Sequence, residues 1–139
     1  MSEPEAPPPH RSGRRKARKY ALDVLYAADI QGVDPVAIAA QGLVTTQAAL
    51  PELSWGLVEG VVDNLAAIDD KIREHLKSGW TLERMPAVDR ALARIAVYEA
   101  TLGDTPREVA VSEAANLAAE LSTEESPRFL SGLLGAILR

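Results

Sequence analysis

The 139-residue chain contains no cysteine, which excludes disulfide bonds, thiolate nucleophiles and cysteine-based zinc sites. A chain without cysteine also fits a reducing compartment, so a cytoplasmic location is expected. Apolar runs of about 18 residues, which a membrane-spanning helix requires, are absent. No apolar stretch follows the first basic residues, as it would in a signal peptide. We therefore expect one soluble domain with no membrane contact.

The sequence also lacks the residue patterns that carry enzymatic or metal chemistry. The two histidines, His10 and His75, have no second histidine at the spacing of metal ligands. There is no G-x-S-x-G motif and no phosphate-binding glycine loop. Adjacent acidic residues such as Asp69 and Asp70 point to different faces of a helix, which makes them poor acid–base pairs. The sequence predicts no enzyme activity, no cofactor and no metal site.

Signals for β-structure are missing as well, because no long segment alternates apolar and polar residues and no Asn-Gly or Asp-Gly hairpin turn occurs. Apolar residues instead recur at intervals of three and four, which is typical of helices with one buried side. The clearest case is Leu130, Leu133, Leu134 and Ile137. We predict an all-α fold, a compact bundle of about seven helices.

Proline, glycine and capping residues indicate where these helices begin and end. Residues 1–13 are rich in proline and glutamate and are predicted to form a disordered tail, which leaves 14–139 as a single domain. The expected helices start at Arg14, at Val36 behind an Asp34 cap, at Pro51 (one helix reaching Leu76), at Pro86, at Thr105-Pro106 and at Ser126-Pro127. Thr105 and Glu108 also fit a capping box, in which each side chain binds a free backbone amide.

The net charge of -5 hides an uneven distribution along the chain. Residues 1–19 hold six Lys or Arg and two Glu, whereas 20–139 hold nine Lys or Arg and 18 acidic residues. A basic arm on an acidic body predicts that a polyanion would bind at the arm.

Five of the six cations of the arm are concentrated in residues 14–19, here called the basic segment: Arg14, Arg15, Lys16, Arg18 and Lys19. Positive charge in the first turn of a helix opposes the helix dipole, and a polyanion would neutralise it. Arg15, Lys19 and Tyr26 share one helical face, so an aromatic ring lies below the charges. Single-stranded RNA is bound in this way, with cations on phosphates and a ring against a base. We therefore predict RNA binding.

A second candidate surface lies at the start of the last helix, between Ser126 and Phe129. The amino end of a helix can receive a phosphate, and Phe129 can stack on a base. The alternative, that Phe129 packs in the core against Leu133, is left open by the spacing.

Three stretches together resemble the NusB family of transcription antitermination factors. They are residues 14–26 (RRKARKYALDVLY), 88–99 (VDRALARIAVYE) and 105–138 (TPREVAVSEAANLAAELSTEESPRFLSGLLGAIL). Residues 69–76 (DDKIREHL) and Trp80 also fit the family, so the resemblance covers nearly all of 14–138. It departs from the family pattern at Ser112 and Ser131, where asparagine is usual, and at Gly135, where an acidic residue is common.

The resemblance implies an all-helical fold and binding of single-stranded boxA RNA together with NusE, a small-subunit ribosomal protein. With other Nus factors the pair helps RNA polymerase read through terminators in ribosomal RNA operons. It also implies that the basic segment, Tyr26, Ser126 and Phe129 contact RNA, and that Asp89 makes a polar contact with the partner.

Two other functions stay open on the sequence. The same fold occurs as the RNA-binding module of ribosomal RNA cytosine methyltransferases, and a helical protein-interaction module with a basic arm would look similar. The sequence also leaves open whether the chain forms a homodimer and whether a dimer would cover the RNA site.

Overall fold

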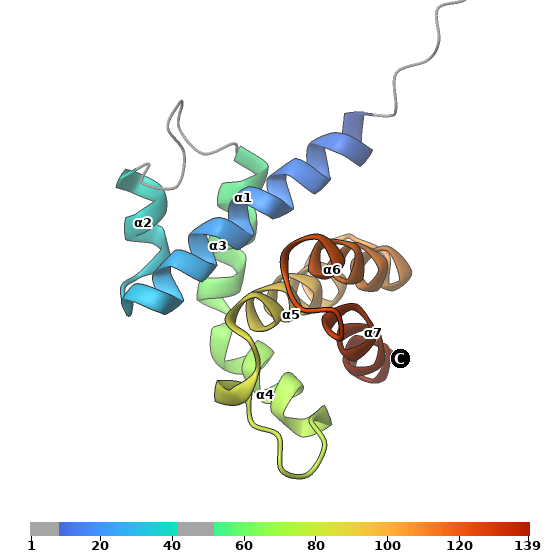
Figure 1. Cartoon of the computed structure of the whole chain (residues 1–139). Coiled ribbons are helices and arrows are strands. Elements are labelled where there is room, and N and C mark those ends of the chain that lie inside the picture. Colours follow the sequence, from blue (N-terminus) through green and yellow to red (C-terminus); the bar gives the residue numbers. More distant parts are fainter. Residues whose placement is uncertain (1–8, 42–51) are drawn as a thin grey trace, which may run out of the picture.

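The computed structural model describes residues 9–41 and 52–139, which contain seven α-helices, one short 3-10 helix and no strand (Figure 1). The all-α prediction is confirmed. The helices are α1 (Pro9–Gln31), α2 (Pro35–Gln41), α3 (Glu52–Asp63), α4 (Leu65–His75), η1 (Leu82–Arg84), α5 (Ala87–Thr101), α6 (Arg107–Leu121) and α7 (Ser126–Ile137). None of the helices in the described ranges is long and apolar enough to cross a membrane.

Helix α1 begins at Pro9, whereas the sequence predicted a start at Arg14. Proline is favoured at the first position of a helix because its fixed φ already suits the helix and its missing N–H would have no partner there. The helix therefore begins five residues earlier than predicted, and residues 1–8 of the predicted tail lie outside the described residues. At the other end of α1, Gly32 has a positive φ of 68°, a conformation that glycine adopts without strain.

The single helix predicted from Pro51 to Leu76 is two helices, because the chain breaks at Asn64. Asn64 lies outside helical geometry (φ -119°, ψ 18°), and its side-chain amide donates to the carbonyl of Gly60 at 2.8 Å. A side chain that hydrogen-bonds the preceding turn competes with the helical backbone pattern. The apolar stripe continues across the break, with Ile68 and Ile72 buried, but Leu65 is exposed.

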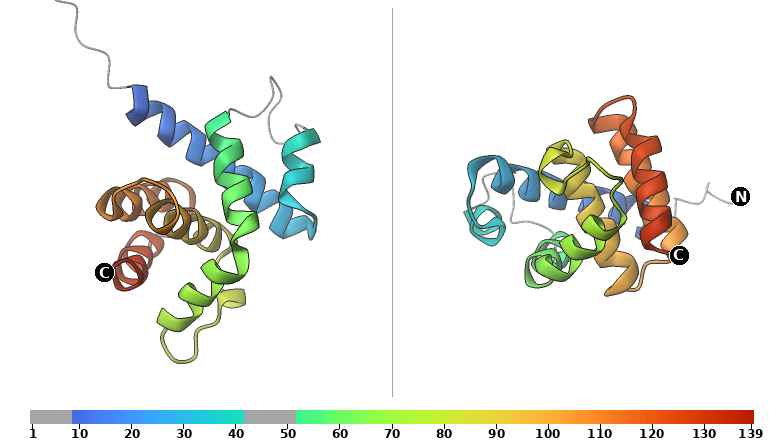
Figure 2. Two further views of the ribbon diagram at one scale, coloured as in Figure 1. Left: turned by 180° about the vertical axis from the view of Figure 1, so that it is seen from behind. Right: turned by 90° about the horizontal axis from the view of Figure 1, so that it is seen from below.

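Helix α5 is central to the packing: it contacts α1 and α3 on one side and α6 and α7 on the other (Figures 1 and 2). Close packing of α3 on α5 requires Gly60, since a Cβ atom there would overlap the ring of Tyr98. The largest fully buried apolar side chains come from α4, α5, α6 and α7: Ile68, Ile72, Leu92, Leu117, Leu130 and Leu134.

Candidate nucleic-acid interface

The basic segment lies on the part of α1 that faces α5 and α6 (Figure 1). Its five cations differ sharply in their surroundings. Lys16 is exposed and Arg14 is half-buried, and neither forms an ion pair with any residue that the structure describes. The other three pair with carboxylates of α5 and α6, which the sequence did not predict.

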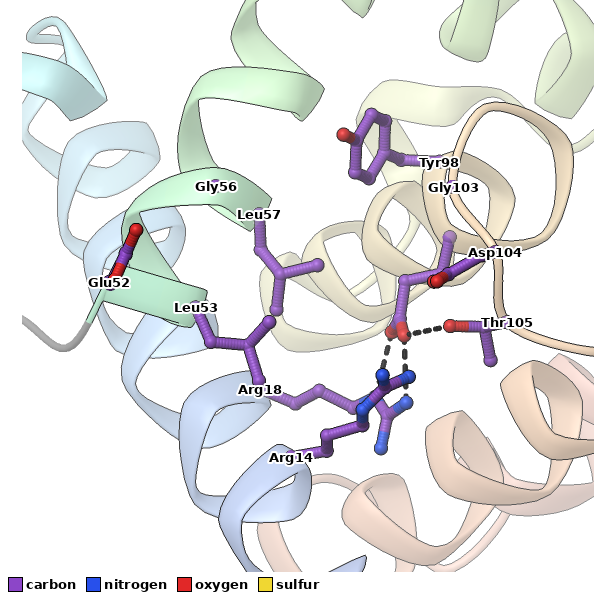
Figure 3. A pocket seen from close by; sticks show the side chains of 11 residues that line it. Arg14, Arg18, Glu52, Leu53, Gly56, Leu57, Tyr98, Gly103, Asp104 and Thr105 are labelled. Carbon is purple, nitrogen blue, oxygen red and sulfur yellow. Dashed lines mark hydrogen bonds and ion pairs between the residues drawn. The ribbon is translucent and has the colours of Figure 1, made fainter. Parts of the chain in front are cut away.

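Arg18 is buried, with only 4% of its surface exposed. Its Nε and Nη2 atoms donate to the two carboxylate oxygens of Glu99 at 2.7 Å each (Figure 3). Its Nη1 donates to Glu113 at 3.2 Å. Burial alone would lower the pKa of this guanidinium, but the hydrogen bonds and charges of the two glutamates outweigh burial and raise the pKa. Each nitrogen of the Arg18 guanidinium thus donates to a carboxylate inside the protein, and the direct contact of Arg18 with RNA stays a prediction.

Arg15 and Lys19 form more exposed ion pairs along α6. Arg15 Nη2 lies 2.6 Å from Glu113 Oε2, and Lys19 Nζ lies 2.6 Å from Glu120 Oε1. The bond to Glu113 raises the pKa of Arg15. Half of the Arg15 side chain remains exposed, so it can still face a ligand. The spacing of Glu113 and Glu120, two helical turns apart on α6, is the sequence signal that could have revealed this acidic strip.

The expected capping box at the start of α6 is absent. Thr105 is buried, and its hydroxyl donates to Glu99 Oε2 at 2.8 Å (Figure 3). Glu108 is exposed and pairs with Arg107 instead. Thr105 therefore completes the binding of the Glu99 carboxylate, beside Arg18, and does not cap the helix.

A cleft of about 440 Å³ opens next to this buried ion pair (Figure 3). Arg14 and Arg18 of α1 line one side, and Leu53, Leu57 and Tyr98 form much of the apolar wall. No group of three potential metal-ligating side chains occurs within the described ranges. The cleft therefore offers an apolar surface beside both a cation, Arg14, and the acidic residues Glu52 and Asp104.

Asp89, expected at a partner surface, is 1% exposed and lies in the first turn of α5. Its two carboxylate oxygens accept hydrogen bonds from the hydroxyls of Ser122 (2.6 Å) and Ser126 (2.9 Å). Ser126 also accepts a hydrogen bond from the backbone N–H of Thr123 at 3.2 Å. Both predicted site residues are thus inside the protein, where they fix residues 122–125, here called the α6–α7 turn.

Tyr26 is 41% exposed, as an RNA-contacting ring requires. It lies on α1 beyond the basic segment. Asp23 lies between Lys19 and Tyr26, and burial raises the pKa of its carboxyl group while the charge of Lys19 opposes the shift. This side of α1 therefore carries the acidic Asp23 as well as Lys19 and the ring of Tyr26.

Phe129 packs against the core, the alternative that the sequence left open, and its predicted stacking on a base stays a prediction. It is partly buried against the hydrophobic core, and its ring also lies against the exposed ring of Trp80, with the ring centres 5.9 Å apart and tilted by 35°. Trp80 was not predicted as a site residue, since only the fold brings these two residues together.

Comparison with known proteins places the chain in a family. The model of the NusB family matches residues 15–139. The transcription antitermination protein NusB of Salinispora tropica is 52% identical over 89% of this chain and 93% of its own length. The protein of the same name from Beutenbergia cavernae is 48% identical over 92% of this chain and 90% of its own length.

Solved structures agree with the sequence matches. NusB of T. maritima superposes with a TM-score of 0.77 at 30% identity, over 99% of this chain and 92% of that one. A chain from the crystal structure of the antitermination factors NusB and NusE in complex with double-stranded RNA gives a TM-score of 0.75 at 26% identity, over 92% of this chain and 97% of that one. The protein therefore belongs to the NusB family, whose members are transcription antitermination proteins and not enzymes.

Proposed function

We propose that this chain acts in the cytoplasm by binding single-stranded boxA RNA of ribosomal RNA operons together with NusE, in a complex with RNA polymerase and other Nus factors. The observation that carries the proposal is the basic segment, which presents cations on the surface of an otherwise acidic protein. A relative with this fold has been solved with NusE and RNA, which supports the same partners here.

In this proposal the predicted RNA residues have two kinds of role. Arg14, Arg15, Lys16 and Lys19 contact phosphates and Tyr26 contacts a base, because their side chains are at least partly exposed. Arg18 acts as a positioning residue that fixes α1 on α5 and α6. Ser126 and Asp89 likewise position the α6–α7 turn, from which α7 carries Phe129 toward a base.

The salt dependence of RNA binding tests the basic segment. The logarithm of the affinity for single-stranded RNA falls with the logarithm of salt concentration, with a slope of about 0.7 per phosphate contact. Replacing both Arg14 and Lys16 by Gln should therefore reduce the slope by about 1.4. A matched control replaces Arg107, the first residue of α6, and Arg139, two other exposed cations, by Gln and should leave the slope unchanged. An unchanged slope in the first variant would refute RNA contact by these residues.

Coupling between RNA and NusE tests the partner. The acidic body repels RNA outside the basic segment, so a partner that covers acidic surface near the start of α5 should raise RNA affinity. Linkage then requires RNA to raise the affinity for NusE by the same factor, typically about 5–150-fold. Titrations of NusE with and without boxA RNA at one salt concentration measure this factor, and equal affinities would refute the coupling.

The same titrations separate the alternatives. A protein-interaction module would bind NusE or another protein but not RNA, whereas a methyltransferase-associated module would bind ribosomal RNA without coupling to NusE. Sedimentation with and without RNA tests the homodimer: a dimer that dissociates when RNA binds would cover the RNA site.

A further inference from the structure

Trp80, in the loop that follows α4, and Phe129, in the first turn of α7, lie ring against ring and are here called the aromatic pair. We propose that this pair and the cations around it form a second part of the RNA interface, on which a base of single-stranded RNA stacks against Trp80. The inference rests on the proposed function, which already directs Phe129 toward a base, and adds to it Trp80 as a base-binding residue.

The geometry of the pair leaves room for a ligand. The ring of Phe129 packs partly into the core, while Trp80 remains 48% exposed although it lies against Phe129. A tryptophan that served only to cover the core would gain more by burying its large apolar surface. Every nucleobase offers an apolar face of similar size, and stacking on an aromatic side chain stabilises bound single strands.

The loop holds Trp80 in place before any ligand arrives. The backbone N–H of Trp80 donates to the carbonyl of Lys77 at 3.0 Å. The carbonyl of Gly79 accepts from Arg84 Nη1 at 3.1 Å, and Gly79 has a φ of 89°, which favours glycine. A loop whose backbone is already fixed loses less conformational entropy on binding, which favours affinity.

The charges near the pair favour a polyanion. Lys77, Arg84 and Arg128 are exposed, lie close to one ring or the other along the chain, and form no ion pair with any described residue. This contrasts with the basic segment, where three of five cations are paired. Among the acids of this region, Glu83 is paired with Arg73, and Glu124 and Glu125 of the α6–α7 turn remain exposed. Cations around an exposed ring are the arrangement that binds single-stranded nucleic acid without reading its sequence.

The test uses the fact that the chain has only two tryptophans, Trp55 and Trp80. In the Trp55→Phe variant all tryptophan fluorescence comes from Trp80, and stacking of a base on the indole quenches it. Titration of this variant with boxA-like RNA should therefore quench the emission in step with binding measured by RNA anisotropy. The reciprocal variant, Trp80→Leu, reports only the half-buried Trp55 and should show little quenching.

Affinity gives the second readout. Trp80→Leu should weaken RNA binding by about 5- to 150-fold, the range found when one stacking ring is lost, while Trp80→Phe keeps a ring and should recover much of the affinity. Lys77→Gln should reduce the salt slope by about 0.7. The control Leu102→Ser removes a similarly exposed apolar side chain at the end of α5 and should change neither quantity. Melting curves give the folded fraction of each variant, and the measured affinities are corrected for that fraction.

The outcomes separate this inference from the proposed function. If RNA binds and depends on Arg14 and Lys16, but Trp80 emission and the Trp80→Leu affinity are unchanged, the inference is overturned and the proposed function stands. If Trp80→Leu weakens NusE binding in the absence of RNA, the surface is a protein interface and the inference is again overturned. If no RNA binds with or without NusE, the proposed function itself fails.

Discussion

Helix α5 carries one buried acidic residue near each end, and the two are stabilised in different ways. Asp89, in the first turn, is bound by two serine hydroxyls and by no cation that the structure describes. Glu99, in the last turn, accepts hydrogen bonds from Nε and Nη2 of Arg18 and from the hydroxyl of Thr105. Both residues are at least 95% buried, so burial does not explain the difference.

The direction of the helix dipole does explain it. The amino end of a helix is partly positive, so a carboxylate there is stabilised by the backbone and hydroxyl donors suffice. The carboxyl end is partly negative, so a buried carboxylate there requires a full positive charge nearby. That cation is Arg18 of the basic segment, and its bonds to Glu99 hold α1 on α5.

The two ends of α5 have different structural roles. Its amino end positions the α6–α7 turn and thereby Phe129, whereas its carboxyl end orients the basic segment through Arg18. The two parts of the proposed RNA surface are therefore attached to the same central helix.

The largest expected effect tests the charged end. Arg18→Ala leaves Glu99 buried without a cation, whereas Glu113 keeps its ion pair with Arg15. The change should lower the free energy of unfolding by about 3–5 kcal/mol. Urea denaturation measures the loss, and Arg107→Ala, at an exposed arginine, serves as the control. A loss as small as that of the control would show that solvent, and not Arg18, stabilises Glu99.

A smaller effect is expected at the uncharged end. Asp89→Asn keeps the shape but replaces one acceptor oxygen by an NH₂ group facing a serine hydroxyl, which should cost about 1–3 kcal/mol of stability. RNA affinity in the folded fraction should also fall, because the turn that precedes Phe129 loosens. If Asp89→Asn destabilises the protein as much as Arg18→Ala, the dipole explanation for the difference between the two ends is wrong.

The smallest effect concerns the exposed pair of Lys19 and Glu120, which lies outside both buried clusters. Exposed ion pairs contribute about 0–1 kcal/mol, so Glu120→Gln should release Lys19 for phosphate and raise RNA affinity by no more than about fivefold. In a Lys19→Gln background the same change should raise affinity only as much as Glu74→Gln, which removes an exposed charge from α4. Equal gains in both backgrounds would mean that Glu120 acts through general charge repulsion.

The sequence predicted the helices and the basic segment because both depend on neighbouring residues. A period of three to four apolar residues, prolines at helix starts and a cluster of cations are local patterns. They located α2, α5, α6 and α7 well, and the resemblance correctly indicated the NusB family. Local rules failed where a side chain had a choice of partners: Asn64 bonded the preceding turn, and Thr105 bonded Glu99 rather than its own helix.

Only the tertiary structure decides which cations remain available to a ligand. Arg18 and Lys16 lie two residues apart and look equivalent in the sequence, yet one is buried against Glu99 and the other is exposed. Likewise, Asp89 and Ser126 were predicted at the surface but are hydrogen-bonded to each other inside the protein. Trp80 and Phe129 are 49 positions apart in the sequence, and only the fold brings their rings together. Composition and spacing determine how much charge and how many rings a helix carries, but the pairing of those groups depends on contacts between helices distant in the chain.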